Sequence, residues 1–168
     1  DISLPNRCLK QMTLFAVKPK LDIIGTYVEE FDTDTDEVVS VKKVPVMHKD
    51  IASYSKRRNP FNRQSVAFRK SFAEKICEDY EFIARMLQHG AKGQNIPEVL
   101  VRYRIDENTV DTRKSWEHTK AFIRVRWIIH RSGYTGFRDF FMPCALQLGL
   151  FIFPRKFTRW VYRTFLRK

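Results

Sequence analysis

The chain has 168 residues, of which 43% are hydrophobic and 30% are charged, with three cysteines and a formal net charge of +12. This composition is apolar enough for a folded core and excludes an intrinsically disordered chain. Three widely spaced cysteines exclude a disulfide-stapled scaffold and a Cys-x-x-Cys zinc site. Reduced thiols and a cytoplasmic location are therefore the expectation.

The positive charge is concentrated in the C-terminal third of the chain. Residues 113–168 contain thirteen lysines and arginines and only two acidic residues, whereas residues 1–112 are nearly neutral. A neutral body with a basic tail predicts a polyanionic partner for the tail alone. We therefore expect two domains, 1–112 and 113–168.

The first predicted elements are a helix and a β-hairpin. Ser3, with a proline shortly after it, indicates a helix start, and apolar residues recur at helical spacing as far as Lys18. Asp22–Val28 is predicted as a buried strand and Glu37–Val44 as its hairpin partner.

The acidic connector of this hairpin resembles the opening of a calcium-binding loop. Such a loop needs glycine at its sixth position and glutamate at its twelfth, and here these positions hold Glu37 and Lys43. A solvated turn is therefore predicted at 32–37.

The middle of the chain is predicted to contain a loop with a short helix at 45–55, a half-buried strand at 65–69, a helix at 78–90, and two short strands at 92–96 and 98–104. The helix is the clearest of these, because it has two carboxylates in its first turn and Gly90 just after its last turn. The two short strands are separated by Pro97, which cannot donate a ladder hydrogen bond.

The basic tail is predicted to be helical throughout. Residues 140–154 form an uncharged run of about 22 Å as a helix, too short for a hydrocarbon core of about 30 Å. Residues 155–168 interleave aromatic and aliphatic side chains with lysines and arginines, as is typical of a helix lying at a membrane surface. We therefore expect residues 138–168 to contact an anionic membrane surface.

Two alternatives for the tail stay open. Residues 140–153 could pack as a core helix while the cations only solubilise the protein. The tail could instead bind nucleic acid, but its cations are interleaved with large aliphatic residues and no known nucleic-acid motif is present. No nucleic-acid partner is therefore expected.

The candidate site for chemistry is the predicted helix start at Glu78 and Asp79. The positive end of a helix dipole favours the ionised form of a carboxylate, and an ionised carboxylate can act as a general base toward a hydroxyl. On spacing alone, two ordinary helix-stabilising acids are the favoured interpretation. The four histidines are scattered without ligand-like pairing and are predicted to be surface or capping residues.

Several short segments, taken in their order along the chain, favour the catalytic interpretation. They are Asp1–Arg7, Gln11, Asp22–Gly25, Arg58–Asn62, Ser65–Lys70, Glu78–Tyr80, Ala91–Lys92 and Asn95–Val101. In this order the chain resembles the bacterial family 2 glycosyltransferases with a GT-A fold, which build surface polysaccharides. The resemblance covers residues 1–104, and the basic helical tail is similar to tails in that family. It implies an α/β, partial GT-A fold with a C-terminal helical extension.

The resemblance also implies an activity. Such enzymes transfer a sugar, usually with inversion, from a nucleotide-sugar donor to a polysaccharide or lipid-linked glycan acceptor at the inner face of the plasma membrane. By resemblance, Asp79 is the general base and Glu78 its neighbour or orienting partner. The residues that would line the acceptor side are Arg58, Asn59, Asn62 and Arg63, the last standing where the family usually has histidine. Phe61 is expected to anchor their loop.

In the family, a DxD motif holds a divalent metal, Mg²⁺ or Mn²⁺, on the donor diphosphate. The resemblance places that motif upstream of Asp1, so no metal ligands are expected in this chain. The expectation is an N-terminally truncated glycosyltransferase, with residues 1–112 as its acceptor-side part and little or no activity by itself. The competing hypothesis is a catalytically inactive, membrane-associated interaction module.

Overall fold

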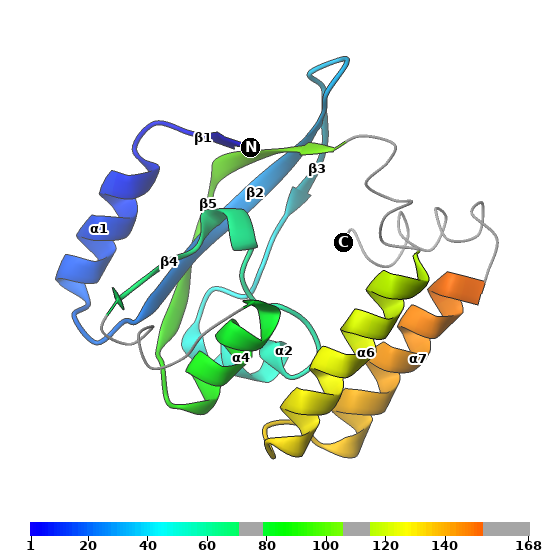
Figure 1. Cartoon of the computed structure of the whole chain (residues 1–168). Coiled ribbons are helices and arrows are strands. Elements are labelled where there is room, and N and C mark those ends of the chain that lie inside the picture. The colour runs from blue at the N-terminus through cyan, green and yellow to red at the C-terminus, as the bar shows by residue number, and fades with distance from the viewer. Residues whose placement is uncertain (71–78, 106–114, 153–168) are drawn as a thin grey trace. The chain divides into compact units, whose positions relative to one another are not determined.

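The computed structural model describes residues 1–70, 79–105 and 115–152 (Figure 1). The chain divides into two compact units, residues 1–104 and residues 105–168. The first unit is a mixed α/β domain built on a five-stranded sheet, and the described part of the second is a pair of helices.

The sheet of the first unit has the strand order β1-β5-β2-β3. These strands are β1 (Ile2–Ser3), β5 (Gly93–Ile105), β2 (Ile23–Asp32) and β3 (Val38–Lys42), and the short β4 (Ala67–Phe68) pairs antiparallel with the start of β2. β2 is buried along most of its length. Such a strand is expected to be rich in apolar residues on both faces, as the sequence from Ile23 onward is.

The chain does not enter its first helix at Ser3, and that prediction was wrong. Ser3 belongs to β1, where it pairs with Val101, and the amide of Leu4 donates to the carbonyl of Leu100 at 3.0 Å. α1 (Arg7–Val17) begins after Asn6, whose φ of 67° turns the chain. The capping signal at Ser3 was overridden by backbone pairing with a strand about a hundred residues away.

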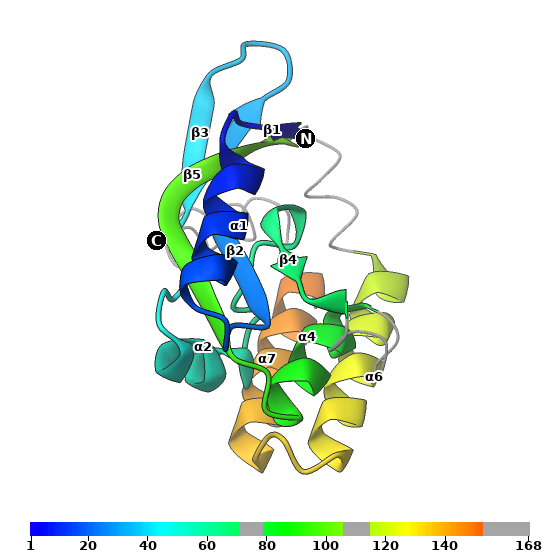
Figure 2. The ribbon, with the colours of Figure 1, turned by 90° about the vertical axis from the view of Figure 1, so that its left-hand side faces the viewer.

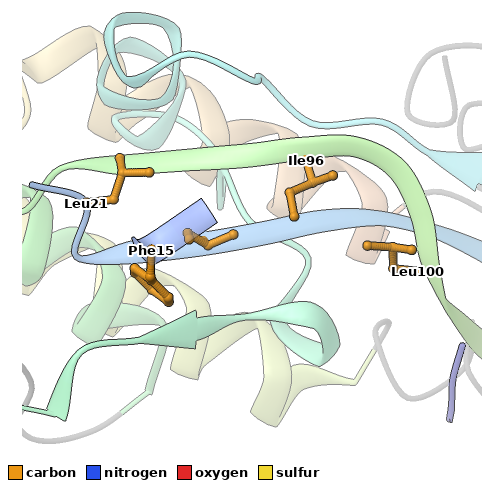
Figure 3. Packing of buried hydrophobic residues seen from close by; sticks show 5 residues of the cluster. Phe15, Leu21, Ile96 and Leu100 are labelled. Atoms are coloured by element: carbon orange, nitrogen blue, oxygen red, sulfur yellow. The ribbon is translucent and has the colours of Figure 1, made fainter. Parts of the chain in front are cut away.

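The core of the first unit lies between α1 and the sheet. Phe15 of α1 packs with Leu21, Ile24, Ile96 and Leu100 (Figure 3), and Figure 2 shows α1 crossing in front of β5 and β2. Each such side chain contributes about 1.5–3 kcal/mol when it is fully buried. The helix predicted for this segment is confirmed, but of the apolar residues whose spacing predicted it only Phe15 is buried, and Leu9 and Met12 are exposed.

The predicted hairpin of β2 and β3 is confirmed. Its connector is a turn in which Asp32 Oδ1 accepts hydrogen bonds from the amides of Asp34 at 2.9 Å and Thr35 at 3.1 Å, and Asp36 has a φ of 57°. These bonds, the Asp34 amide first, lower the pKa of the Asp32 carboxyl below its ordinary value of 3.8. The acidic run therefore serves to close the hairpin.

Pro97 does not divide two strands, and that prediction was also wrong. β5 is continuous from Gly93 to Ile105. On one side it pairs with β1, and that pairing reaches only Val101 and Arg102. A proline is tolerated in a strand where its missing N–H falls on an unpaired edge. The strand is not broken at Pro97, because β1 does not pair with β5 at that position and so no backbone N–H is needed there.

Two helices complete the described part of the first unit. α2 (His48–Ser55) fulfils the prediction of a short helix there, and α4 (Asp79–Gln88) confirms the clearest helix in the body of the chain. Beyond α4, Gly90 has a φ of 89°, and the amide of Ala91 bonds back to Met86 at 2.9 Å. This left-handed glycine is the helix end predicted from the sequence.

The second unit is a helical hairpin, shown in yellow and orange in Figure 1. α6 (Trp116–Arg131) is capped by the Ser115 hydroxyl, which accepts from the His118 amide at 3.1 Å, and α7 (Phe137–Ile152) follows a short turn. Trp127 contacts Phe140, and Trp116 contacts Phe151, so the helices are antiparallel. None of the described helices is both long and apolar enough to cross a membrane. The helix predicted at 155–168 lies outside the described residues.

Candidate functional site

The segment 58–65, which the resemblance places on the acceptor side, leaves the end of α2 as an ordered loop. The amide of Arg58 donates to Tyr54 at 2.9 Å, and Asn59 Oδ1 accepts from the amide of Phe61 at 3.1 Å, forming a local turn around Pro60. Arg58 and Arg63 are exposed at the two ends of this turn. The loop therefore presents two guanidinium groups from a defined backbone.

Phe61 anchors this loop to the sheet, as predicted. Its side chain is only 2% exposed and lies against two glycines on neighbouring strands, Gly25 of β2 and Gly93 of β5. A Cβ atom at Gly25 would come within 2.8 Å of the ring, and one at Gly93 within 2.7 Å. Only glycine at both positions lets the ring approach the strands so closely.

Asn62 is part of the framework that holds the loop. It is 8% exposed, and its Nδ2 donates to the carbonyl of Thr26 at 2.9 Å and to that of Lys42 at 3.2 Å. Both amide hydrogens are thus used to join the loop to β2 and β3. The hydroxyl of the fully buried Ser65 accepts from the amide of Thr26 at 2.9 Å, which adds a second link to β2.

Asn95 was not predicted as a site residue, yet it fixes the loop from the other side. It is fully buried in β5, and its Nδ2 donates to the carbonyls of Pro45 at 2.6 Å and Pro60 at 3.0 Å. Its Oδ1 accepts no hydrogen bond from the described residues. That oxygen faces Gly25, where a Cβ would lie 2.3 Å away, so it meets a Cα–H group instead.

Gln11 extends the same framework to α1. It is 3% exposed, and its Nε2 donates to the carbonyls of Ser65 at 2.7 Å and Ile24 at 3.3 Å. Arg7, one turn earlier, donates to the carbonyl of Gln64 at 2.9 Å. The sequence signal for Gln11 and Asn95 was a polar residue at an otherwise apolar, buried position of a helix or strand. Such residues are retained inside when they satisfy backbone groups.

One of the two carboxylates predicted to carry the chemistry lies in the described residues. Asp79 is the first residue of α4, and Glu78 lies outside the described residues. The helix itself is held by buried Ile83, Met86 and Leu87. The predicted position of Asp79 in the first turn of a helix is therefore confirmed, and its catalytic role stays a prediction.

Three of the histidine rings, at positions 48, 89 and 130, bind backbone groups. His48 Nδ1 lies 3.3 Å from the amide of Gly93, His89 Nδ1 lies 2.8 Å from the carbonyl of Arg85, and His130 Nδ1 lies 2.8 Å from that of Thr135. In the described ranges, no three His, Cys, Asp or Glu side chains are grouped so that they could hold a metal ion. The metal that the resemblance implies therefore finds no ligand set among these residues.

Comparison with known proteins gives this geometry a context. No family model matches the chain. It is 29% identical to an uncharacterized glycosyltransferase of Haemophilus influenzae over 174 aligned residues, which cover all of this chain and 65% of the relative. The chain is similar to glycosyltransferases.

Two further glycosyltransferases support the same likeness. The chain is 28% identical to the UDP-Gal:alpha-D-GlcNAc-diphosphoundecaprenol beta-1,3-galactosyltransferase of Escherichia coli, across its full length and 64% of that relative. It is 30% identical to the amylovoran biosynthesis glycosyltransferase AmsE of Erwinia amylovora, across 82% of this chain and 54% of AmsE. The chain thus spans between half and two thirds of the length of these glycosyltransferases. The predicted resemblance to glycosyltransferases is therefore confirmed, whereas family 2 and the GT-A fold stay predictions.

Proposed function

We propose that this chain is part of a family 2-like, inverting glycosyltransferase with a GT-A fold, which transfers a hexose from a nucleotide-sugar to a lipid-linked or polysaccharide acceptor. The observation that carries this proposal is the similarity along the whole chain to two glycosyltransferases, one of them named for a diphosphoundecaprenol-linked acceptor. The mixed α/β sheet with an ordered, basic loop is compatible with such a domain.

In the proposed reaction, Asp79 removes the proton of an acceptor hydroxyl while that oxygen attacks the anomeric carbon of the donor sugar. The bond from that carbon to the diphosphate breaks, and the nucleoside diphosphate leaves with the electron pair. Asp79 suits the role because the N-terminal end of α4 favours an ionised carboxylate. Glu78 is proposed as its neighbour or orienting partner.

The proposed acceptor side is the loop from Arg58 to Arg63. Guanidinium groups bind phosphate oxygens in a bidentate manner, so the exposed Arg58 and Arg63 suit a diphosphate-linked or otherwise anionic acceptor. Asn59 is proposed to shape the turn beneath such an acceptor. Asn62 would act by positioning, because both hydrogens of its amide are bonded to strand carbonyls.

The proposed place of action is the inner face of the plasma membrane, with residues 138–168 against an anionic surface. The support is the charge of this segment, in which seven lysines and arginines accompany one acidic residue. A lipid-linked acceptor would be reached from the same surface. Each such cation adds roughly 1 kcal/mol of attraction near an anionic leaflet.

The test measures sugar transfer from a nucleotide-sugar donor to a diphosphoundecaprenol-linked acceptor. Asp79→Asn removes the proposed base, and we expect a loss of at least about 100-fold in transfer with unchanged binding of the acceptor. Asp50→Asn is the matched control, because Asp50 is an acidic residue in the first turn of another helix, α2. An equal, small effect of both substitutions would reduce Asp79 to a helix-stabilising acid and overturn its assignment.

A further inference from the structure

α7 has two faces, and the contacts of the second unit cover only one of them. Phe140 and Phe151 contact tryptophans of α6, and Gln147 donates to the Thr119 hydroxyl at 3.2 Å. Cys144, which lies between Phe140 and Gln147 in the sequence, is buried. The opposite face is exposed. Its large side chains are Phe137, Phe141, Met142, Leu146 and Ile152.

This exposed face, defined by those five side chains, is continuous along the helix. At about 100° per residue they occupy roughly one half of the helix circumference, the half that does not face α6. Met142 is 69% exposed and Ile152 is 74% exposed. From Phe140 to Ile152 the sequence holds no charged residue at all. Soluble proteins rarely leave so much contiguous apolar surface without a partner.

The charges around this face indicate which partner it takes. Arg131 and Arg138 are exposed near the turn of the helical hairpin. In the sequence that follows α7, residues 155–168 add six lysines and arginines and no acidic residue. An uncharged apolar segment that is flanked in the sequence by cations complements a surface that is apolar inside and anionic outside. An anionic phospholipid bilayer has that structure.

We propose that α7 lies flat in the headgroup region of an anionic phospholipid bilayer, with its exposed face among the acyl chains. This inference rests on the proposed membrane contact of residues 138–168 and assigns it to a specific helix face. With 16 residues α7 is about 24 Å long, which suits a helix parallel to the surface better than one crossing it. The face turned toward α6 stays in protein contact, so the hairpin need not open.

The test is binding of the full 168-residue chain to phosphatidylglycerol-containing vesicles, with phosphatidylcholine vesicles as the neutral comparison. Met142→Glu and Leu146→Glu place a charge on the exposed face, and we expect each to weaken vesicle partitioning by about tenfold or more. Met12→Glu and Leu9→Glu are matched controls, because these residues are also exposed on a helix, α1, of the other unit. The controls carry the same charge change and should bind like the wild type.

A second measurement does not depend on the acidic variants. Phe141→Trp should add fluorescence that brominated phospholipids quench, whereas Leu9→Trp should add fluorescence that they leave unquenched. Equal weakening by all four acidic variants, absent quenching at position 141, or no vesicle binding by the wild type would each overturn the inference. A dimer that Met142→Glu dissociates, in a chain that ignores vesicles, would assign the face to a second copy instead. The vesicle experiments contain no donor or acceptor sugar, so their outcomes are independent of glycosyl transfer.

Discussion

The loop at 58–65 in the first unit and α7 in the second differ in the side chains that they bury and expose. In the first unit, polar side chains such as Asn62 and Asn95 are buried and bonded to backbone carbonyls. In the second, large apolar side chains such as Phe141 and Met142 are exposed on one face of α7. Buried, satisfied amides specify a single position for a loop, whereas an uncovered apolar face specifies a partner outside the unit.

The contrast matters for how a motif is understood. The residues Gln11, Gly25, Asn62 and Asn95, on which the resemblance partly depends, contact one another or the same loop. Their role is to hold Arg58 and Arg63 in place. A motif can thus consist mostly of residues that fix the backbone of a loop.

The largest expected effect is the difference in stability loss between two phenylalanine-to-alanine substitutions, one in each unit. Phe61→Ala removes a ring that is 2% exposed and should lower the free energy of unfolding by about 3–5 kcal/mol. Phe141→Ala removes an exposed ring and should change it by less than about 0.5 kcal/mol. Urea denaturation of both variants measures this difference. Similar losses would mean that the face of α7 is covered within the folded chain.

The next effect concerns a close approach of backbone and side chain. Gly25→Ala would place a Cβ 2.3 Å from Asn95 Oδ1, and we expect a loss of about 1–3 kcal/mol in stability. Gly136→Ala is the matched control in the second unit, because a Cβ there meets nothing closer than 3.9 Å. Thermal or urea unfolding gives both values.

A double mutant tests the cause of the Gly25 effect. In an Asn95→Ala background the clashing oxygen is gone, so Gly25→Ala should cost clearly less than it does in the wild type. Simple additivity of the two losses would show that the approach of Asn95 to Gly25 is not the source of the strain.

The smallest expected effect is a pH dependence at the hairpin turn of the first unit. The pKa of Asp32 is lowered mainly by the Asp34 and Thr35 amides, so the ionised carboxylate stabilises the folded turn. Because the folded pKa lies below the unfolded one, this stabilisation is fully present above the unfolded pKa. It is lost as the pH falls through the folded pKa.

An NMR titration of the Asp32 side chain should therefore give a midpoint below 3.8. Asp32→Ala should reduce stability at neutral pH and have a smaller effect in strong acid. A titration midpoint at or above the ordinary value would show that the turn is open in solution.

Local patterns predicted most helices and the first hairpin, because the signals for them lie within a few residues. Apolar spacing located α1 and α4, a short buried-strand pattern located β2 with β3 as its hairpin partner, and Gly90 marked a helix end. The same reasoning failed at Ser3 and Pro97, where pairing with a distant strand or a missing neighbour decided the structure.

The candidate site was predicted in part. The sequence and its resemblance identified the loop at 58–63, Phe61 as its anchor, and Asp79 at a helix start. They did not reveal that the side-chain amide of Asn62 donates hydrogen bonds to two strands. They also did not reveal that Asn95 of β5 donates hydrogen bonds to the loop. These contacts join positions more than thirty residues apart in several cases, and no local pattern encodes them.

The sequence alone thus determined most of the secondary structure, the division of charge and the likeness to glycosyltransferases, since each depends on residue types and their order. Only the tertiary structure decided which polar groups are buried and which apolar ones are exposed. The uncharged run beginning at Phe140 illustrates the reason. Its residues look alike in the sequence, but packing against α6 buries one face of α7 and leaves the other to a partner.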